Sequence, residues 1–206
     1  MTLTRAPLRY TPAHWMQFID GENLTIQAQA LITELSLKVQ DCDFFKRDSY
    51  LYPQGQGISH AFGDPPPQVE PIPVRSFYYT SCRGDEPLRQ AVRTQLWQLG
   101  FEAHVFKKTD TRKAKGVDIA LTKDMLSHAF RNNYEVAVLV AGDGDYVPLV
   151  EEVKRLGKRV EVHFFEAPTN HELKLSADGF TDIRDTIIRW ATEEEARQVA
   201  AKKAHA

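Results

Sequence analysis

Val136-Ala137-Val138-Leu139-Val140, followed directly by Ala141-Gly142-Asp143-Gly144-Asp145, says more about the fold than any other stretch of this chain. Five consecutive apolar residues, three of them β-branched valines, are typical of a strand buried on both faces of a parallel sheet. The run then meets glycine and two aspartates, which belong outside the core. The sequence therefore predicts a central strand whose carboxyl end carries acidic side chains.

Other short apolar runs resemble this one, and amphipathic segments separate them. We expect strands at 15–19, 74–79, 101–106 and 159–165, and helices at 24–38, 86–99, from 117 onward, at 145–156, briefly near 173, and at 181–197. Strands that alternate with helices of this length indicate an α/β fold. The prediction is a mostly parallel sheet of about five strands.

Residues 41–73 interrupt the alternation. They contain six of the 11 prolines of the chain, together with glycines and aromatic residues, and predict an inserted loop. Its aromatic side chains are expected to pack on the domain, or alternatively to stack on bases. Because the α/β pattern resumes afterwards, we expect one domain over 14–190. A C-terminal tail or helix end that frays is expected over 191–206.

Composition excludes several classes of protein. The net charge of −2 provides no global basic field, so any binding of nucleic acid needs a local patch. The two cysteines form no CxxC pair, and no apolar stretch approaches the roughly 18 residues of a membrane span. The chain has no Walker loop, GxGxxG, GxSxG or HExxH motif. Few cysteines and the lack of a signal peptide favour a cytoplasmic location.

Acidic residues fall at corresponding places in the predicted fold. Asp20 ends the first strand, Asp118 begins the helix after the third, and Asp143 and Asp145 follow the fourth. Carboxyl ends of parallel strands share one edge of a sheet, where ligands bind. Carboxylates gathered there repel one another unless a cation is present, and oxygen ligands favour Mg²⁺ or Mn²⁺. The pattern therefore predicts a hard-metal site.

Each acidic motif also has a structural interpretation. Asp-Gly after a strand is a common turn, and Asp143 or Asp145 could cap the next helix. Asp118 could complement a helix dipole. Asn23 could orient a metal-bound water or bond the backbone of its own turn. Gly142 and Gly144 are expected to allow tight turns and a close approach of phosphate.

Three ordered motifs resemble those of the NYN domain family, the LabA-like branch of the PIN-like nucleases. They are the segments 19–24 (IDGENL), 115–121 (KGVDIAL) and 141–150 (AGDGDYVPLV), supported by 157–162 and 175–180. The resemblance covers 15–183 apart from the insertion. It implies a Rossmann-like α/β/α fold and a metal-dependent ribonuclease site.

Carried over by position, the resemblance makes Asp20, Asp118 and Asp143 metal ligands and Asp145 a further catalytic acid. Asn23 would lie beside them, and Asp124 is a weaker supporting candidate that could instead be a solvated helix charge. The family commonly has Ser before Gly-Asp-Gly-Asp and Phe or Tyr after it. Ala141 departs from the first preference and Tyr146 meets the second.

The function expected from these motifs is hydrolysis of RNA, in single-stranded form, with Mg²⁺ or Mn²⁺. A basic loop would bind phosphates or simply be solvated; its members are Lys107, Lys108, Arg112, Lys113 and Lys115. One alternative is an RNA-binding or regulatory module with little turnover. Another is a small-molecule phosphohydrolase with a closed pocket. The insertion or the C-terminal helix could bind a second copy or a protein partner.

Overall fold

The computed structural model describes residues 13–37, 45–46, 49–50, 72–108 and 116–204. The elements are β1 (His14–Asp20), α1 (Gly21–Glu34), β2 (Phe45–Lys46), β3 (Ser49–Tyr50), β4 (Ile72–Cys82), α2 (Glu86–Gln98), β5 (Glu102–Lys107), α3 (Val117–Phe130), β6 (Val136–Val140), the 3₁₀ helix η2 (Gly144–Tyr146), α4 (Val147–Arg155), β7 (Arg159–Phe164), α5 (His171–Ser176), β8 (Gly179–Asp182) and α6 (Arg184–Ala204). This alternation of strands and helices confirms the predicted α/β class.

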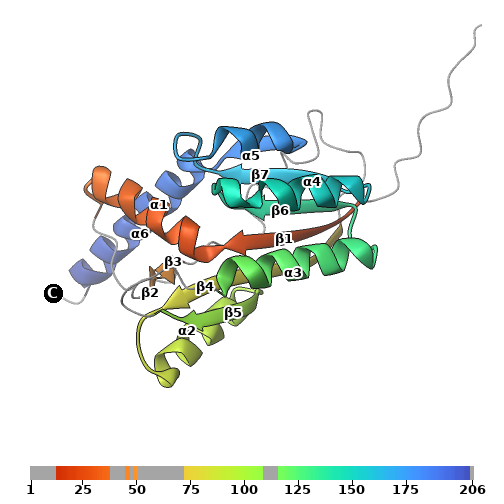
Figure 1. Cartoon of the computed structure of the whole chain (residues 1–206). Coiled ribbons are helices and arrows are strands. Elements are labelled where there is room, and N and C mark those ends of the chain that lie inside the picture. Colours follow the sequence, from red (N-terminus) through yellow and green to blue (C-terminus); the bar gives the residue numbers. More distant parts are fainter. Residues whose placement is uncertain (1–12, 38–44, 47–48, 51–71, 109–115, 205–206) are drawn as a thin grey trace, which may run out of the picture.

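The central sheet has the order β5-β4-β1-β6-β7-β8, and every neighbouring pair is parallel. All its strand arrows therefore run the same way in Figure 1. β1 lies inside the sheet, with Phe18 in register with Phe77 of β4 on one side and Leu139 of β6 on the other. The short β2 and β3 form a separate antiparallel pair.

The sheet has six strands, in agreement with the predicted number of about five, and β8 is the strand that the sequence pattern does not predict. Its sequence, Gly179-Phe180-Thr181-Asp182, contains one large apolar residue and no alternation that would indicate a strand. A helix was expected from residue 181, whereas Thr181 pairs with His163 of β7 and α6 begins at Arg184. Tertiary pairing at the sheet edge thus overrides a weak local pattern.

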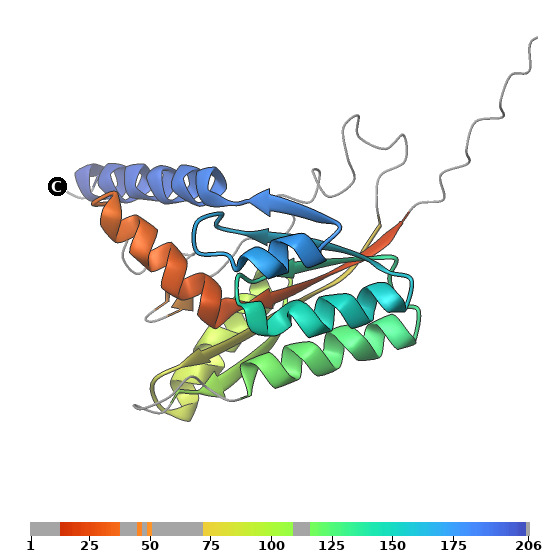
Figure 2. The same cartoon turned by 45° about the horizontal axis from the view of Figure 1, so that its top comes forward.

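Two apolar cores lie on opposite faces of the sheet and produce a three-layer α/β/α fold. On β1, Trp15 and Ile19 face one core, and Met16 and Phe18 face the other, as the period of a strand requires. The first core holds buried residues of α1, α2 and α6, and the second holds those of α3, α4 and α5. Figure 2 shows these helices on both sides of the strands.

Helix ends follow local signals that were only partly recognised. α1 begins at Gly21, three residues before the expected start, because Asp20 caps it and accepts a hydrogen bond from the backbone N of Asn23. The helix predicted at 145–156 is divided into η2 and α4, with Pro148 in the first turn of α4. A positive φ at Gly157 ends the turn after α4.

The C-terminal segment is helical, which is one of the two forms expected for it. α6 extends to Ala204, beyond the expected helix end near residue 197. Ile187, Trp190 and Ala191 bury one side of this helix in the core that α1 also lines, which is a source of helix stability that composition does not show. Of the predicted insertion, only β2, β3 and the first two residues of β4 are among the described residues. No described helix is long and apolar enough to cross a membrane.

Candidate functional site

The carboxyl edge of the sheet brings together residues that lie far apart in sequence. In Figure 1 this edge is where β1 passes into α1, at the left of the sheet, and where α3 begins. Asp20 is the last residue of β1, Asp118 lies in the first turn of α3, and Tyr146 closes the 3₁₀ turn after β6. The predicted meeting place of the strand ends is therefore present, and it gathers two of the predicted acids.

Asp20 and Asp118 share one hydroxyl group. The Oη of Tyr146 lies 2.9 Å from Oδ2 of Asp20 and 3.1 Å from Oδ1 of Asp118. These two carboxylate oxygens are therefore no farther apart than the sum of those distances. A phenol carries one proton and can donate it to only one carboxylate at a time. One of the two acids is consequently left without this donor, close to a second negative charge.

The buried position of Asp20 makes its negative charge unfavourable. Burial raises the pKa of Asp20 from 3.8 to about 6, and Asp118 and Glu22 add to the increase by repulsion. Hydrogen bonds from Asn23 N and Tyr146 oppose the increase without cancelling it. The pKa of Tyr146 is itself raised far above its ordinary value, first by burial and then by the two aspartates, so the phenol remains a donor.

The pair fits a hard divalent cation. Mg²⁺ is usually held by one or two carboxylates, with water and substrate phosphate in the other positions, and a cation would relieve the repulsion that the single hydroxyl cannot. Within the described part of the chain, no group of three or more His, Cys, Asp or Glu side chains is placed so that it could hold a metal. The structure thus assembles a pair of acids, and a ligand role for Asp143 remains a prediction.

Asn23 connects the acid pair to the loop after β6. Its backbone N donates to Oδ1 of Asp20 at 2.9 Å, and its Oδ1 accepts from the backbone N of Gly142 at 3.1 Å. The side chain therefore bonds a loop 119 residues away instead of the backbone of its own turn. This contact joins the end of β1 to the loop after β6, in which Asp143 is the next residue.

Asp143 takes the capping role that was the alternative interpretation, whereas the Asp145 side chain caps no helix among the described residues. Oδ1 of Asp143 accepts from the backbone N of Asp145 at 3.2 Å and caps η2. Asp143 also lines an open hollow of about 330 Å³ with Asn23, Gln27 and Asn170, whereas Asp145 is exposed. A catalytic or ligand role for Asp143 stays a prediction.

The glycines of this loop are needed for space and not for turn geometry. Among the described residues, neither Gly142 nor Gly144 has a positive φ. A Cβ at Gly142 would lie 2.3 Å from the ring of Phe164, and one at Gly144 would lie 2.6 Å from the side-chain nitrogen of Asn170. The loop still forms the tight 3₁₀ turn η2, and the glycines are required there by close packing against neighbouring side chains rather than by a positive φ.

Asp124 belongs to a different group of side chains. It accepts a hydrogen bond from Tyr79 Oη at 3.0 Å and lies 3.8 Å from Nε2 of His104. Asp124 is six residues after Asp118 on α3, about 9 Å along the helix axis. Its contacts with Tyr79 and His104 therefore hold it away from the acid pair. The structure thus separates Asp124 from Asp118.

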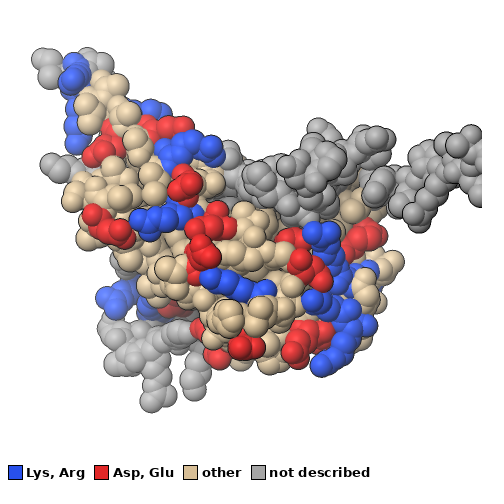
Figure 3. Space-filling model, turned by 90° about the horizontal axis from the view of Figure 1, so that it is seen from above, with Lys and Arg blue, Asp and Glu red and all other residues tan. Residues whose placement is uncertain are grey.

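The described part of the basic loop is partly neutralised. Nζ of Lys108 lies 2.7 Å from Glu22, which also accepts a hydrogen bond from Ser81 at 2.9 Å. Lys107 is exposed at the end of β5, and Arg112, Lys113 and Lys115 lie outside the described residues. On the face shown in Figure 3, the Lys and Arg side chains of the described residues lie among Asp and Glu side chains, with several Lys and Arg gathered at the right edge.

The sequence analysis gave no role to Tyr146, Glu22 or Asn170. Tyr146 was recognised only as matching a family preference for Phe or Tyr, which does not require a hydroxyl. Asn170 caps α5 through Oδ1, and its backbone N bonds the carbonyl of Gly142 at 2.9 Å. An Asn before a short helical segment was a signal for the cap, but its contact with the loop 28 residues earlier could not be foreseen.

Replacing Tyr146 with phenylalanine should raise the pKa of Asp20 above its value of about 6. The variant keeps the ring in the core and removes the donor that lowers this pKa. Titration of the Asp20 carboxyl carbon by NMR, without divalent cations, measures the change. Tyr134→Phe is a matched control, because the hydroxyl of Tyr134 bonds the backbone of Met125. An unchanged or lower Asp20 pKa in Tyr146→Phe would contradict the shared-hydroxyl geometry.

The fold and the acid pair define the class of this protein. It has a Rossmann-like α/β/α fold with carboxylates at the carboxyl edge of the sheet, where such folds bind ligands. Residues 16–184 match the family model of the NYN domain, so the chain belongs to the NYN domain family. This confirms the resemblance inferred from the motifs. NYN domains have a PIN-like nuclease fold and are generally nucleases.

A solved structure shows the same fold. It is the crystal structure of a protein of unknown function from Vibrio parahaemolyticus, with a TM-score of 0.57 and 21% sequence identity, and the match covers 84% of this chain and 93% of that one. At this identity the likeness concerns the fold alone. No curated protein matches the chain.

Proposed function

We propose that this protein is a metal-dependent ribonuclease that hydrolyses phosphodiester bonds of single-stranded RNA at the carboxyl edge of its sheet. One observation carries the proposal: within an NYN fold, two carboxylates compete for the single proton of Tyr146. Such a pair is electrostatically unfavourable for a protein that only binds polyanions, and it suits a protein that binds Mg²⁺ or Mn²⁺.

Asp20 and Asp118 would hold the cation. When bound, a cation of this kind polarises a phosphoryl oxygen and lowers the pKa of a coordinated water. Burial of Asp20 and its hydrogen bond from Asn23 N keep one carboxylate oxygen fixed. Tyr146 orients the other oxygen of Asp20 and one oxygen of Asp118, so the remaining oxygen of Asp118 faces no hydrogen bond from Tyr146.

Asp143 would complete the site from the neighbouring loop. The contacts of Asn23 and Asn170 with Gly142 hold that loop at the edge of the hollow. With one oxygen engaged at the backbone N of Asp145, the Asp143 carboxylate can accept a proton from the attacking water or bind the cation through a water. Asp145, which is exposed, would add negative charge at the rim.

Phosphates of the bound strand would meet positive charge on the opposite side of Asp20. Lys108 and Arg83 line a hollow of about 210 Å³ together with Glu22 and Ser81. The ion pair with Glu22 holds the ammonium of Lys108 in place but reduces its attraction for phosphate. The exposed Lys107, and the lysines and arginine of the basic loop, would contribute further phosphate contacts.

The RNA-binding module with little turnover is the second candidate. The observation that favours it is that the described residues assemble two carboxylates, not a set of three, as a possible metal site. Both proposals predict binding of RNA, and they differ in cleavage.

Incubation of the purified protein with end-labelled single-stranded RNA separates the two. We expect cleavage with Mn²⁺ or Mg²⁺ and none after addition of excess chelator, with recovery when the cation is restored. Single-stranded DNA and duplex RNA of the same sequence serve as comparison substrates. RNA binding without any cleavage, under every cation tested, would favour the binding module and refute the ribonuclease.

A further inference from the structure

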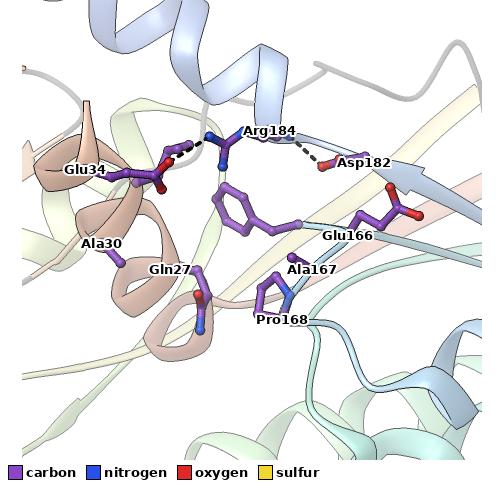
Figure 4. A pocket seen from close by; sticks show the side chains of 10 residues that line it. Gln27, Ala30, Glu34, Glu166, Ala167, Pro168, Asp182 and Arg184 are labelled. Carbon is purple, nitrogen blue, oxygen red and sulfur yellow. Dashed lines mark hydrogen bonds and ion pairs between the residues drawn. The ribbon is translucent and has the colours of Figure 1, made fainter.

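A second and larger hollow lies beside the proposed catalytic edge. It has a volume of about 770 Å³ and is lined by the exposed side of α1, by the loop between β7 and α5, and by the junction of β8 with α6. Figure 4 shows Gln27, Ala30 and Glu34 on α1 facing Ala167 and Pro168 across this space, with Arg184 and Asp182 at its end. Its size lies within the range of about 300–1,000 Å³ found for small-ligand sites.

This hollow adjoins the one that Asp143 lines. Gln27 and Pro168 contribute to both. Gln27 is four residues after Asn23, so the two side chains follow one another along the same face of α1. A chain whose scissile phosphate lies at Asp20 and Asp118 would therefore have the larger hollow within reach of a neighbouring nucleotide.

The lining of this hollow combines an apolar wall with one arginine and three acidic side chains. Leu31, Phe165 and Pro168 supply apolar surface. At one end, Nη2 of Arg184 lies 3.3 Å from Oε1 of Glu34, an exposed pair that joins α1 to α6. Oδ1 of Asp182 accepts a hydrogen bond from the backbone N of Arg184 at 2.9 Å. The exposed Glu166 lies at the rim of the hollow.

Charge argues against phosphate as the occupant. Glu34, Glu166 and Asp182 outnumber Arg184, so the hollow is negative overall. Carboxylates only accept hydrogen bonds, whereas a guanidinium only donates them and has five N–H groups, of which the contact with Glu34 uses one. The suitable occupant is a flat, uncharged group that carries hydrogen-bond donors and acceptors side by side.

We propose that this hollow binds a guanine base of the substrate strand and gives the enzyme a preference for cleavage next to guanine. The proposal rests on the ribonuclease function proposed above. Guanine displays the acceptors O6 and N7, which suit arginine, beside the donors N1–H and N2–H₂, which suit a carboxylate. Splayed bases of single-stranded RNA are bound through these edges and by packing against side-chain surfaces. The exposed Pro168 offers such a surface, whereas Phe165 is buried in the core.

Other bases satisfy fewer of these groups. Uracil offers one ring donor, and cytosine and adenine offer an exocyclic amine without a neighbouring ring N–H on the same edge. Any of them would match fewer of these groups and leave Arg184 and Glu34 paired mainly with each other, as they are in the structure. Sites built around hydrogen-bonding groups discriminate against analogues that lack the matching ones. Arg184 and Glu34 are therefore the expected specificity residues, with Glu166 as the alternative carboxylate.

Two conservative variants test the pocket. Arg184→Gln and Glu34→Gln keep the shape of the hollow and remove its charge complementarity. The substrates are oligoribonucleotides in which one position at a time carries guanine, adenine, cytosine or uracil. We expect the unmodified protein to cleave next to guanine at least tenfold faster than next to any of the other three bases. Each variant should lose most of this preference, while cleavage of sites without guanine changes less than threefold. Arg155→Gln is a matched control in an exposed Arg–Glu pair on α4.

A binding measurement keeps the test valid if catalysis fails. Fluorescence anisotropy with 2′-O-methyl oligomers, which resist hydrolysis, is carried out in chelator. Guanine-containing oligomers should bind at least tenfold more tightly than adenine-containing ones, and Arg184→Gln should remove the difference. This result without cleavage would sustain the pocket and refute the ribonuclease. Equal binding and equal cleavage of all four bases, or a guanine preference unchanged in both variants, would overturn the pocket.

Discussion

Asp20→Asn should lower cleavage of RNA by about 1,000-fold and yet give a protein at least as stable at pH 8 as the unmodified one. Loss of a carboxylate that holds the proposed cation removes several kcal/mol of transition-state stabilisation, and each factor of ten in rate corresponds to about 1.4 kcal/mol. Asparagine keeps an oxygen for the cap on Asn23 N. It also removes a buried charge that Asp118 and Glu22 repel.

Rates are measured with Mn²⁺ on labelled RNA, and stability by urea denaturation in chelator. Asp185→Asn is the matched control, because Asp185 is exposed in the first turn of α6. It should retain the full rate. Retained activity in Asp20→Asn would remove this residue from the site, and a large loss of stability would mean that its charge supports the fold, contrary to the environment described here.

The second large effect is on how stability depends on pH. Burial raises the pKa of Asp20 from its ordinary value of 3.8, which applies to the unfolded chain, to about 6 in the folded protein. Between these values the folded state binds more protons, so the free energy of unfolding falls as pH rises from about 4 to above 6. Two units of pKa correspond to about 3 kcal/mol. Below pH 4 and above pH 7 this group adds no further slope.

Comparison with Asp20→Asn isolates the contribution of this carboxyl from those of all other groups. In chelator, the difference in free energy of unfolding between variant and unmodified protein should grow by about 3 kcal/mol from pH 4 to pH 8. At pH 8, Mn²⁺ at about 100 times its dissociation constant should restore about 2.7 kcal/mol to the unmodified protein and almost nothing to the variant. A difference independent of pH, or equal stabilisation of both by Mn²⁺, would contradict the proposed cation site.

Much of the fold could be predicted from local patterns. Buried parallel strands such as β6 are nearly continuous apolar runs, and glycine or a capping residue marks many of the helix ends, as Gly157 and Asp85 do. These signals lie within a few residues of the feature that they predict. β8 lacked such a signal, because a four-residue edge strand is selected by the neighbour with which it pairs.

The location of the candidate site could be predicted from the sequence, but the contacts between its side chains could not. The common direction of parallel strands guarantees that Asp20 and the loop of Asp143 reach one edge, so that convergence follows from strand order alone. Which side chains then touch depends on a few ångströms of packing between segments that lie 28 to 126 residues apart in the sequence. The Tyr146 hydroxyl between Asp20 and Asp118, the bond from Gly142 to Asn23 and the diversion of Asp124 to Tyr79 are contacts of this kind. A sequence pattern specifies the face and end of an element, whereas the direction of each side chain is set by the neighbours that fold against it.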